Sequence, residues 1–302
     1  MRLFLISLAL LISGCDLFPQ SHLQRVQEKG ILQVLTRNSA TTYYEGPFGP
    51  TGLEYDLAAG FAEFLGVRLR IETPDTLSRI LVEIQGGNAD LAAAGLTVTE
   101  ERKAYINFGP SYQRITPQLV YRVGTASPRN LDELNGNLEV VAKSSHAERL
   151  TSLQDEYPNL TFEENSELES QQLLDLVWEQ LVDYTVADSN EVAIIRRFYP
   201  ELRVAFDIST PVPLAWAFPP GEDRSLIDKA EEYFSNAYNL EPQNPWRINQ
   251  LAYHLINYDI DINEGMELIE KGLEQYSEDA GLLQVKGWGF TSRVSWKNQS
   301  NF

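Results

Sequence analysis

The sequence predicts an α/β protein of two lobes, followed by an all-α segment. Three observations predict this class. Strand-like apolar runs alternate with amphipathic helices over 31–219, extended segments near 112–118 and 205–213 divide that region into two units, and only helical patterns follow residue 224. Alternation at this spacing is typical of parallel sheets with crossover helices. Two lobes joined by two crossings indicate hinge closure over a cleft.

The first lobe is predicted at about 30–112 and is completed by 210–223. Short apolar runs predict its strands, and helical periodicity that ends in glycine predicts its helices. The strands are expected at 31–36, 67–72 and 90–95, and the helices at 56–66 and 77–87.

The second lobe is predicted at about 118–205. Its extended segments and strands are expected at 118–122, 138–143, 160–165 and 184–189, and its helices at 145–158, 168–180 and 190–200. The runs 202–209 and 213–219 are interpreted as the return connection between the lobes.

The helical region 224–290 contains an internal repeat. Two of its helices align at an offset of 35 residues, which places Ala230 and Phe234 opposite Gly265 and Ile269. Small and bulky residues at this period resemble the tetratricopeptide repeat, in which small residues let paired helices approach closely. We expect this segment to dock an envelope protein partner, and 291–302 to form an irregular tail.

The N-terminus predicts export and a lipid anchor. A basic start and a short apolar run precede Ser13-Gly14-Cys15, a pattern that resembles a bacterial lipoprotein signal peptide over 1–15. Cys15 is the single cysteine, so we expect it to carry the lipid and to hold the protein at a membrane of the periplasm. An ordinary signal peptide is the alternative. Residues 16–29 are interpreted as a polar tether, and Asp16 resembles an inner-membrane retention signal.

Charge and composition exclude several classes of partner. The formal net charge of −19 repels phosphate backbones, so we expect no nucleic-acid partner. The histidines, His22, His146 and His254, are scattered along the chain, so we expect no metal site, and we expect no cofactor.

Five short stretches together resemble the family 3 solute-binding proteins, the periplasmic amino-acid receptors. The resemblance covers about 31–238 and implies the two-lobed periplasmic-binding-protein (type II) fold and a small amino-acid or muropeptide ligand. The stretches are GLEYDL (52–57), NADL (88–91) leading into GLTVTEER (95–102), FGPSY (108–112), VVAKSSHAERL (140–150) and YTVADSNE (184–191).

The same resemblance implies the ligand contacts. Arg102 matches the arginine that clamps the ligand carboxylate, and its planar guanidinium suits a bidentate pair. Thr97 and Ser145 would add hydroxyl and N–H groups, and Asp188 would bind the ligand ammonium group. An aromatic wall against the ligand is assigned to Tyr43 or Tyr44.

Ordinary helix starts explain two of these residues without a ligand. Thr97 to Glu100 is a capping-box pattern ahead of a helix, and Arg102 would then pair with Glu100 or Glu101 in solvent. Asp188 would likewise be a cap. Both interpretations stay open, because a cap at this helix also sets where Arg102 points.

More narrowly, 88–112 and 181–194 resemble the regulatory domain of the membrane-bound lytic murein transglycosylase F family. Those enzymes carry a Glu-Ser motif ahead of a G-L-M-Q-like run. Gly281 to Gln284 is similar to that run, but the sixty residues before it hold no Glu-Ser pair, and Glu169-Ser170 is interpreted as surface. We therefore expect binding rather than cleavage, with a murein lytic transglycosylase or a ligand-free scaffold as alternatives. This resemblance favours the outer membrane.

Overall fold

The computed structural model describes residues 20–47, 49–239, 252, 262–277, 279, 282–283 and 285–287. The predicted signal peptide with Cys15, the residue His254 and the tail 291–302 lie outside the described residues. None of the helices among the described residues is both long and apolar enough to span a bilayer.

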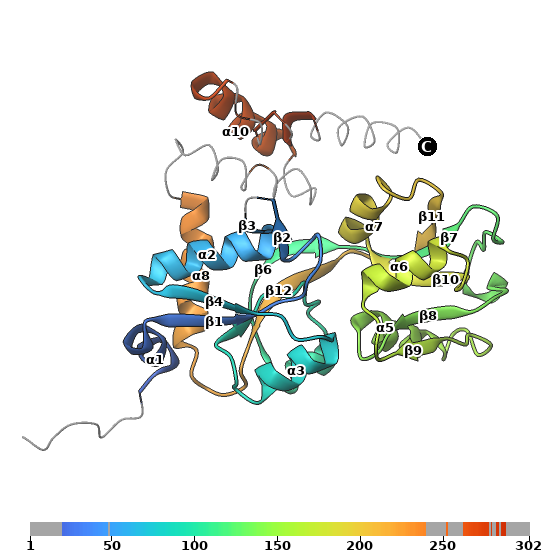
Figure 1. Ribbon diagram of the computed structural model, residues 1–302, viewed down its shortest axis with the longest axis horizontal. Coiled ribbons are helices and arrows are strands. Elements are labelled where there is room, and N and C mark those ends of the chain that lie inside the picture. The colour runs from blue at the N-terminus through green and yellow to red at the C-terminus, as the bar shows by residue number, and fades with distance from the viewer. Residues whose placement is uncertain are drawn as a thin grey trace, which may run out of the picture.

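The first lobe is built on a mixed five-stranded sheet (Figure 1). β1 pairs in parallel with its neighbours β4 and β5, as the strand–helix alternation predicts, and β12 runs antiparallel to β5 and β6. The strand order is β4 (Arg68–Glu72), β1 (Ile31–Leu35), β5 (Leu91–Ala92), β12 (Val212–Phe218) and β6 (Asn107–Ile115).

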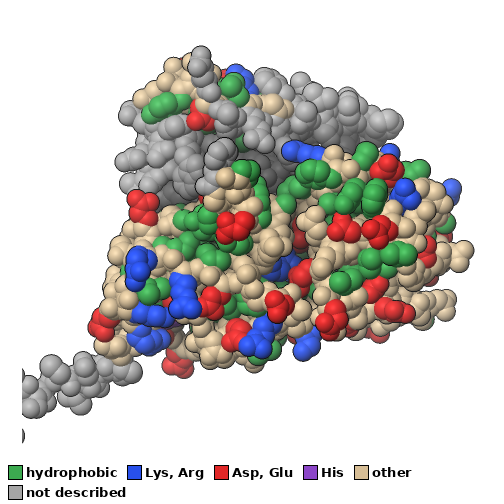
Figure 2. All heavy atoms as spheres, viewed as in Figure 1, with side chains coloured by type: hydrophobic (Ala, Val, Ile, Leu, Met, Phe, Trp, Pro, Cys, Tyr) green, Lys and Arg blue, Asp and Glu red, His purple; other side chains and the backbone are tan. Residues whose placement is uncertain are grey.

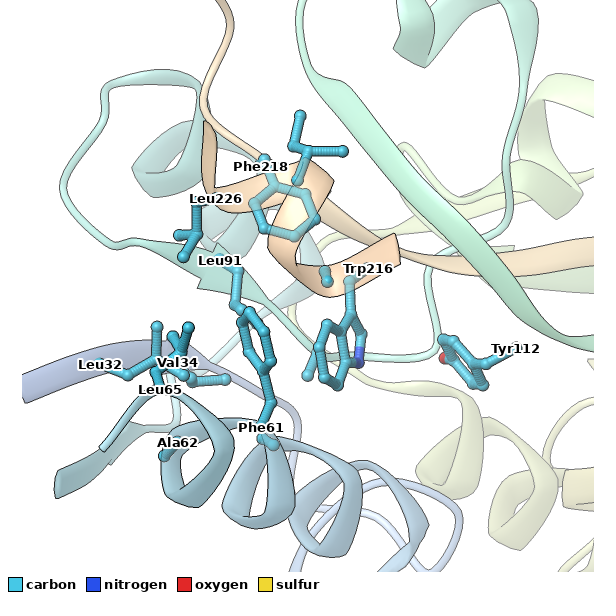
Figure 3. Packing of buried hydrophobic residues seen from close by; sticks show 14 of the residues in the cluster. Leu32, Val34, Phe61, Ala62, Leu65, Leu91, Tyr112, Trp216, Phe218 and Leu226 are labelled. Carbon is cyan, nitrogen blue, oxygen red and sulfur yellow. The ribbon is translucent and has the colours of Figure 1, made fainter. Parts of the chain in front are cut away.

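Helices cover both faces of this sheet, with α2 and α3 on opposite sides in Figure 1. The helices of the lobe are α1 (His22–Lys29), α2 (Leu53–Leu65), α3 (Leu77–Gln85), α4 (Glu100–Lys103) and α8 (Ser225–Asn239). A small hairpin, β2 (Tyr44–Gly46) and β3 (Gly49–Thr51), precedes α2. The core centres on Phe61 and Trp216, whose ring centroids lie 5.5 Å apart (Figure 3).

The second lobe has its own five-stranded sheet. β10 pairs in parallel with β8 and antiparallel with β7. The order is β11 (Leu202–Asp207), β7 (Pro117–Arg122), β10 (Tyr184–Asp188), β8 (Leu138–Val141) and β9 (Glu163–Asn165), with α5 (Ser145–Leu153), α6 (Ser170–Trp178), α7 (Ser189–Ile195) and a 3-10 turn at Leu131–Glu133.

Two crossings join the lobes, so the predicted two-lobed α/β class is confirmed. One crossing passes from β6 to β7 and the other from β11 to β12. The runs interpreted as the return connection are the two strands that this second crossing joins: β11 is the edge of the second sheet, and β12 lies between β5 and β6 in the first. An apolar run near a crossing does not by itself show whether the segment pairs as a strand of a sheet or only connects the two lobes.

Two helices differ from the predicted domain limits. Residues 22–29, interpreted as tether, form α1, and its Val26 is buried in the first-lobe core. α8, assigned to the repeat segment, buries Leu226 and Ala230 in the same core. In both helices an amphipathic pattern marks one apolar face but does not identify the surface that covers it. The tetratricopeptide-like repeat stays a prediction: farther on, α10 (Ile262–Gln275) contributes to a separate small apolar cluster.

Candidate functional site

A cavity with an empty volume of about 360 Å³, part of it open to solvent, lies between the lobes. On the face shown in Figure 2, basic and acidic side chains meet at the junction of the two lobes. Both lobes contribute residues to the walls of the cavity. The four residues expected to contact the ligand by their charge or hydroxyl groups all line it: Thr97, Arg102, Ser145 and Asp188. The other lining residues are Arg37, Leu77, Gly95, Leu96, Val141, Ser144, His146, Ser170 and Glu191.

The segment 97–102 combines a helix cap with a contact between the lobes. Thr99 is the N-cap of α4, and its hydroxyl accepts a hydrogen bond from Arg102 N at 3.2 Å. Because Thr99 supplies the cap, the Thr97 hydroxyl is available elsewhere, and it accepts a hydrogen bond from Ser145 Oγ at 3.1 Å. The capping-box interpretation of Thr97 is therefore wrong in its residue: the cap lies two residues later, at Thr99, and it leaves Thr97 free to contact the other lobe.

Arg102 is buried, with 2% of its surface exposed, and it bridges the lobes. Its Nη1 donates to the Thr97 carbonyl at 3.1 Å and its Nη2 to the Lys143 carbonyl at 3.2 Å. Its Nε lies 3.3 Å from Glu148 Oε1 but has no aligned hydrogen-bond acceptor within the described chain. Burial lowers the pKa of Arg102 and the Glu148 charge opposes this shift, while the group stays protonated at physiological pH.

The expected solvent pair of Arg102 with Glu100 or Glu101 is wrong. Glu100 pairs with Lys103 at 2.6 Å, and the partner of Arg102 is Glu148 on α5 of the other lobe. The one-turn helix α4 directs Arg102 inward, so the neighbouring acids stay on the outer surface.

Asp188 stands at the N-cap position of α7 but makes no side-chain capping bond. Its Oδ1 lies 2.8 Å from His146 Nε2, and both side chains are buried. A buried carboxylate needs a partner, and the imidazole supplies it here. His146, which the sequence left as a scattered histidine, therefore belongs to the wall of the cavity.

Arg37 is the main site residue that the sequence reasoning missed. Its Nε donates to the Ala94 carbonyl at 2.9 Å, while Nη1 lies 3.4 Å from Glu169 Oε2 and Nη2 lies 3.8 Å from Glu191 Oε1. One signal was present. Arg37 follows the end of a predicted parallel strand, and side chains at the carboxyl ends of such strands gather at ligand sites.

The acids around Arg37 come from the second lobe. Burial acts to lower the pKa of Arg37, but the charges of Glu191 and Glu169 outweigh it and raise that pKa. Burial also raises the pKa of Glu191, and the charge of Arg37 opposes this shift.

The interpretation of Glu169-Ser170 as surface is wrong. Glu169 accepts a hydrogen bond from Leu77 N at 2.7 Å across the cleft, and the Ser170 hydroxyl donates to Glu191 at 2.6 Å.

The two tyrosines predicted as an aromatic wall are not among the residues that line this cavity. The Tyr43 hydroxyl donates a hydrogen bond to Glu45 at 2.5 Å and the ring packs against Tyr55, while Tyr44 is exposed.

A second groove lies beside the cavity and shares Glu191 with it. Its walls include Ser39 to Thr41 from the first lobe and Ile194, Ile195 and Phe198 from the second.

Solved structures with a similar fold include two proteins described with arginine bound. The arginine-bound, truncated ArgBP from T. maritima has a TM-score of 0.62 at 19% identity, covering 70% of this chain and 98% of that one. An amino acid ABC transporter substrate-binding protein from Streptococcus pneumoniae, bound to L-arginine, has a TM-score of 0.62 at 20% identity, covering 71% and 92%. These likenesses show the fold.

Relatives found by sequence share more identical residues with this chain than these solved structures do. "Membrane-bound lytic murein transglycosylase F 1" of Alkalilimnicola ehrlichii is 50% identical over 220 residues, covering 72% of this chain and 44% of that protein. A "Membrane-bound lytic murein transglycosylase F" of Pseudoalteromonas translucida is 34% identical over 303 residues, covering 98% and 63%. The chain therefore spans about half the length of the curated relatives it matches.

The predicted resemblance, both to the receptors and to these relatives, is confirmed at the level of the solute-binding domain. The family described as bacterial extracellular solute-binding proteins, family 3, matches residues 32–279, which is most of the chain. The chain belongs to the bacterial extracellular solute-binding proteins, family 3.

Proposed function

We propose that this chain binds a small solute with an α-carboxylate and an α-ammonium group between its lobes, either an amino acid or the end of a cell-wall peptide. One observation carries the proposal. The same interlobe cavity is lined by the guanidinium groups of Arg37 and Arg102 and by the carboxylates of Asp188 and Glu191. A zwitterion needs both kinds of partner, and both strengthen when the closing lobes exclude water.

The roles follow from the position of each group. Arg102 offers its fork to the ligand carboxylate, supported by Thr97 and by Ser145 at the first turn of α5, where backbone N–H groups and the helix dipole favour an anion. Asp188 takes the ammonium group, and the neighbouring Glu191 adds negative charge. Tyr43 or Tyr44 as an aromatic wall stays a prediction.

Glu148 competes with the ligand for Arg102 in this proposal. Its carboxylate lies 3.3 Å from Arg102 Nε, where a ligand oxygen would also bind. A ligand carboxylate must therefore displace Glu148 or share the guanidinium with it. This contact lowers the apparent affinity and holds the lobes together when the cleft is empty.

The location proposed for this chain is the bacterial envelope, with a lipid on Cys15 as the anchor. The support is the N-terminal pattern and the names of the relatives, which are membrane-bound and act on murein. Binding of a ligand released from the cell wall would then signal cell-wall turnover to a partner protein docked on the helical segment.

The names of the relatives also favour murein cleavage as a second candidate function. Release of anhydro-muropeptides from purified peptidoglycan tests it.

The experiment is a calorimetric titration of the L-amino acids and purified muropeptides into wild type, Arg102→Ala and Glu148→Gln. Losing a bidentate charged pair of about 3 kcal/mol weakens binding about a hundredfold in Arg102→Ala. Glu148→Gln, which removes the competitor, binds more tightly. Arg79→Ala, on an exposed arginine of the same lobe, is the matched control. Unchanged affinity in a folded Arg102→Ala protein overturns the assignment.

A further inference from the structure

Glu54 is a buried carboxylate of the first lobe that the proposed ligand contacts do not use. It is the second residue of α2, lies in the stretch GLEYDL, and has 1% of its surface exposed. Acidic side chains are almost never this buried unless they are paired, so its partners indicate its role.

Three donors converge on the Glu54 carboxylate. Its Oε1 accepts hydrogen bonds from Gly95 N at 2.6 Å and from the Tyr112 hydroxyl, and its Oε2 accepts from Trp216 Nε1 at 3.1 Å. In Figure 3 the indole nitrogen of Trp216 and the hydroxyl oxygen of Tyr112 face each other. Three donors favour the ionised form, which only accepts hydrogen bonds.

Gly95 belongs to the turn that orients both site arginines. The Ala94 carbonyl accepts from Arg37 Nε at 2.9 Å, and the Thr97 carbonyl accepts from Arg102 Nη1 at 3.1 Å. Gly95 itself has φ +63°, and a Cβ there would lie 3.1 Å from Arg37 Nη2. The N–H that Glu54 holds therefore lies between the two carbonyls that position Arg37 and Arg102.

The other two donors sit on the strands that lead into the second lobe. Tyr112 is on β6, which continues through Thr116 into β7, and Trp216 is on β12, which follows β11. β12 also braces the turn directly, because Ala215 N donates to the Leu96 carbonyl at 3.1 Å. Glu54 thus connects the ligand-facing turn to both crossings.

We propose that Glu54 is a positioning residue for ligand binding. Its ionised carboxylate fixes the Ala94–Thr97 turn against β6 and β12, and thereby sets the directions of Arg37 and Arg102. This inference rests on the proposed function, since the arginines are its ligand contacts. Affinity for a carboxylate ligand then rises when Glu54 loses its proton.

The change in ionisation falls near neutral pH. Burial raises the pKa of Glu54 to about 7, although hydrogen bonds from Tyr112, Gly95 and Trp216 and the charge of Arg37 act in the opposite direction. The ionisable groups that act on it are Tyr112 from β6 and Arg37 after β1. A protonated Glu54 is neutral and accepts weaker hydrogen bonds than the carboxylate, so its hold on the Gly95 N–H weakens and the turn loosens.

The first test is an NMR titration of the full chain from acidic to mildly alkaline pH. In wild type the Gly95 N–H and the Nε–H signals of Arg37 and Arg102 shift together through a midpoint near neutral pH. In Glu54→Gln this transition is lost, and in Tyr112→Phe, which removes a bond that lowers the Glu54 pKa, the midpoint moves up. Glu63→Gln, on the exposed face of α2, keeps the wild-type profile.

The second test uses the L-amino acid that gives wild type the largest thermal shift in a panel of all twenty. Wild type binds it roughly tenfold more tightly on the alkaline side of the midpoint than on the acidic side, and Glu54→Gln binds it weakly at both. A Gly95 signal that does not titrate, or equal pH profiles in wild type and Glu54→Gln, overturns the inference. If wild type binds no amino acid, the proposed amino-acid function fails, and the three N–H signals still decide the role of Glu54.

Discussion

At the scale of single residues, each arginine of the cleft has two kinds of partner. Arg37 and Arg102 are each fixed by a carbonyl of the turn 94–97 and each face a carboxylate of the opposite lobe. Burying a charge is unfavourable unless it is paired, so the carbonyl orients the guanidinium and the carboxylate neutralises it. In the proposed function, each of these arginines therefore serves both ligand recognition and closure of the lobes.

Glu54 gives the first lobe a pH-dependent stability. Burial raises its pKa from 4.5 to about 7, so between these values the folded protein keeps a proton that the unfolded chain releases. The stabilising contribution is complete below the unfolded pKa and is lost as the pH rises through the folded one. A shift of this size corresponds to about 3 kcal/mol.

Urea unfolding at a series of pH values measures this contribution. We expect the free energy of unfolding of wild type to fall relative to Glu54→Gln between about pH 5 and about pH 8. Glu63→Gln, which removes an exposed acid from the same helix, keeps the wild-type slope. Parallel curves for wild type and Glu54→Gln would show that Glu54 has an ordinary pKa in the folded protein.

At the scale of elements, α8 completes the first lobe. Phe234 packs on Trp216 with ring centroids 4.9 Å apart, and Leu226 lies in the same cluster (Figure 3). Tyr233 contacts Phe61 at 5.5 Å between ring centroids. Aromatic rings at these distances add to the free energy gained from apolar burial. The helix therefore covers one side of the core that holds Trp216 and Glu54.

Leu226→Ala tests whether α8 belongs to this core. Leu226 is fully buried, so its truncation is expected to lower the free energy of unfolding by about 3 kcal/mol. Val82→Ala, on an exposed position of α3, is the control and is expected to change stability little. A Leu226→Ala protein as stable as wild type would mean that α8 does not contribute to the first-lobe core.

At the scale of the whole molecule, the contacts across the cleft stabilise a closed arrangement. Glu169 is central to them, since one carboxylate oxygen accepts from Leu77 N of α3 and the other lies near Arg37. Both contacts are half-buried, so salt screens them less than it screens pairs in solvent. A ligand that binds the closed form better shifts the population further toward it.

Glu169→Ala is expected to shift the empty protein toward the open form. Losing a charged hydrogen bond of about 1.5–3 kcal/mol changes the closed-to-open ratio roughly ten- to a hundredfold. Small-angle scattering then gives a larger radius of gyration without ligand, and an added ligand restores the wild-type value. Glu167→Ala, an exposed acid two residues away, should leave the scattering unchanged. Identical curves for both variants would exclude a closing role for Glu169.

The sequence alone predicted the parts of the protein that depend on short-range order. Strand and helix periodicity and glycine stops act within a few residues, so they predicted two α/β lobes and their crossings, and the threonine-rich pattern predicted a helix start just before Arg102. The stretches around Thr97, Ser145 and Asp188 each end or begin an element facing the cleft, and the structure brings all of them into one cavity.

Only the tertiary structure decided which distant groups meet. Arg37 and Glu169 are 132 positions apart and Glu54 and Trp216 are 162 apart, so no local pattern links them. The sequence of an amphipathic helix likewise shows one apolar face but not the surface that covers it. For this reason α1 was assigned to the tether and α8 to the repeat segment, although both pack on the first-lobe core. Each of these contacts forms when sheets close and lobes approach, because burial then requires every charge and apolar face to find a complement.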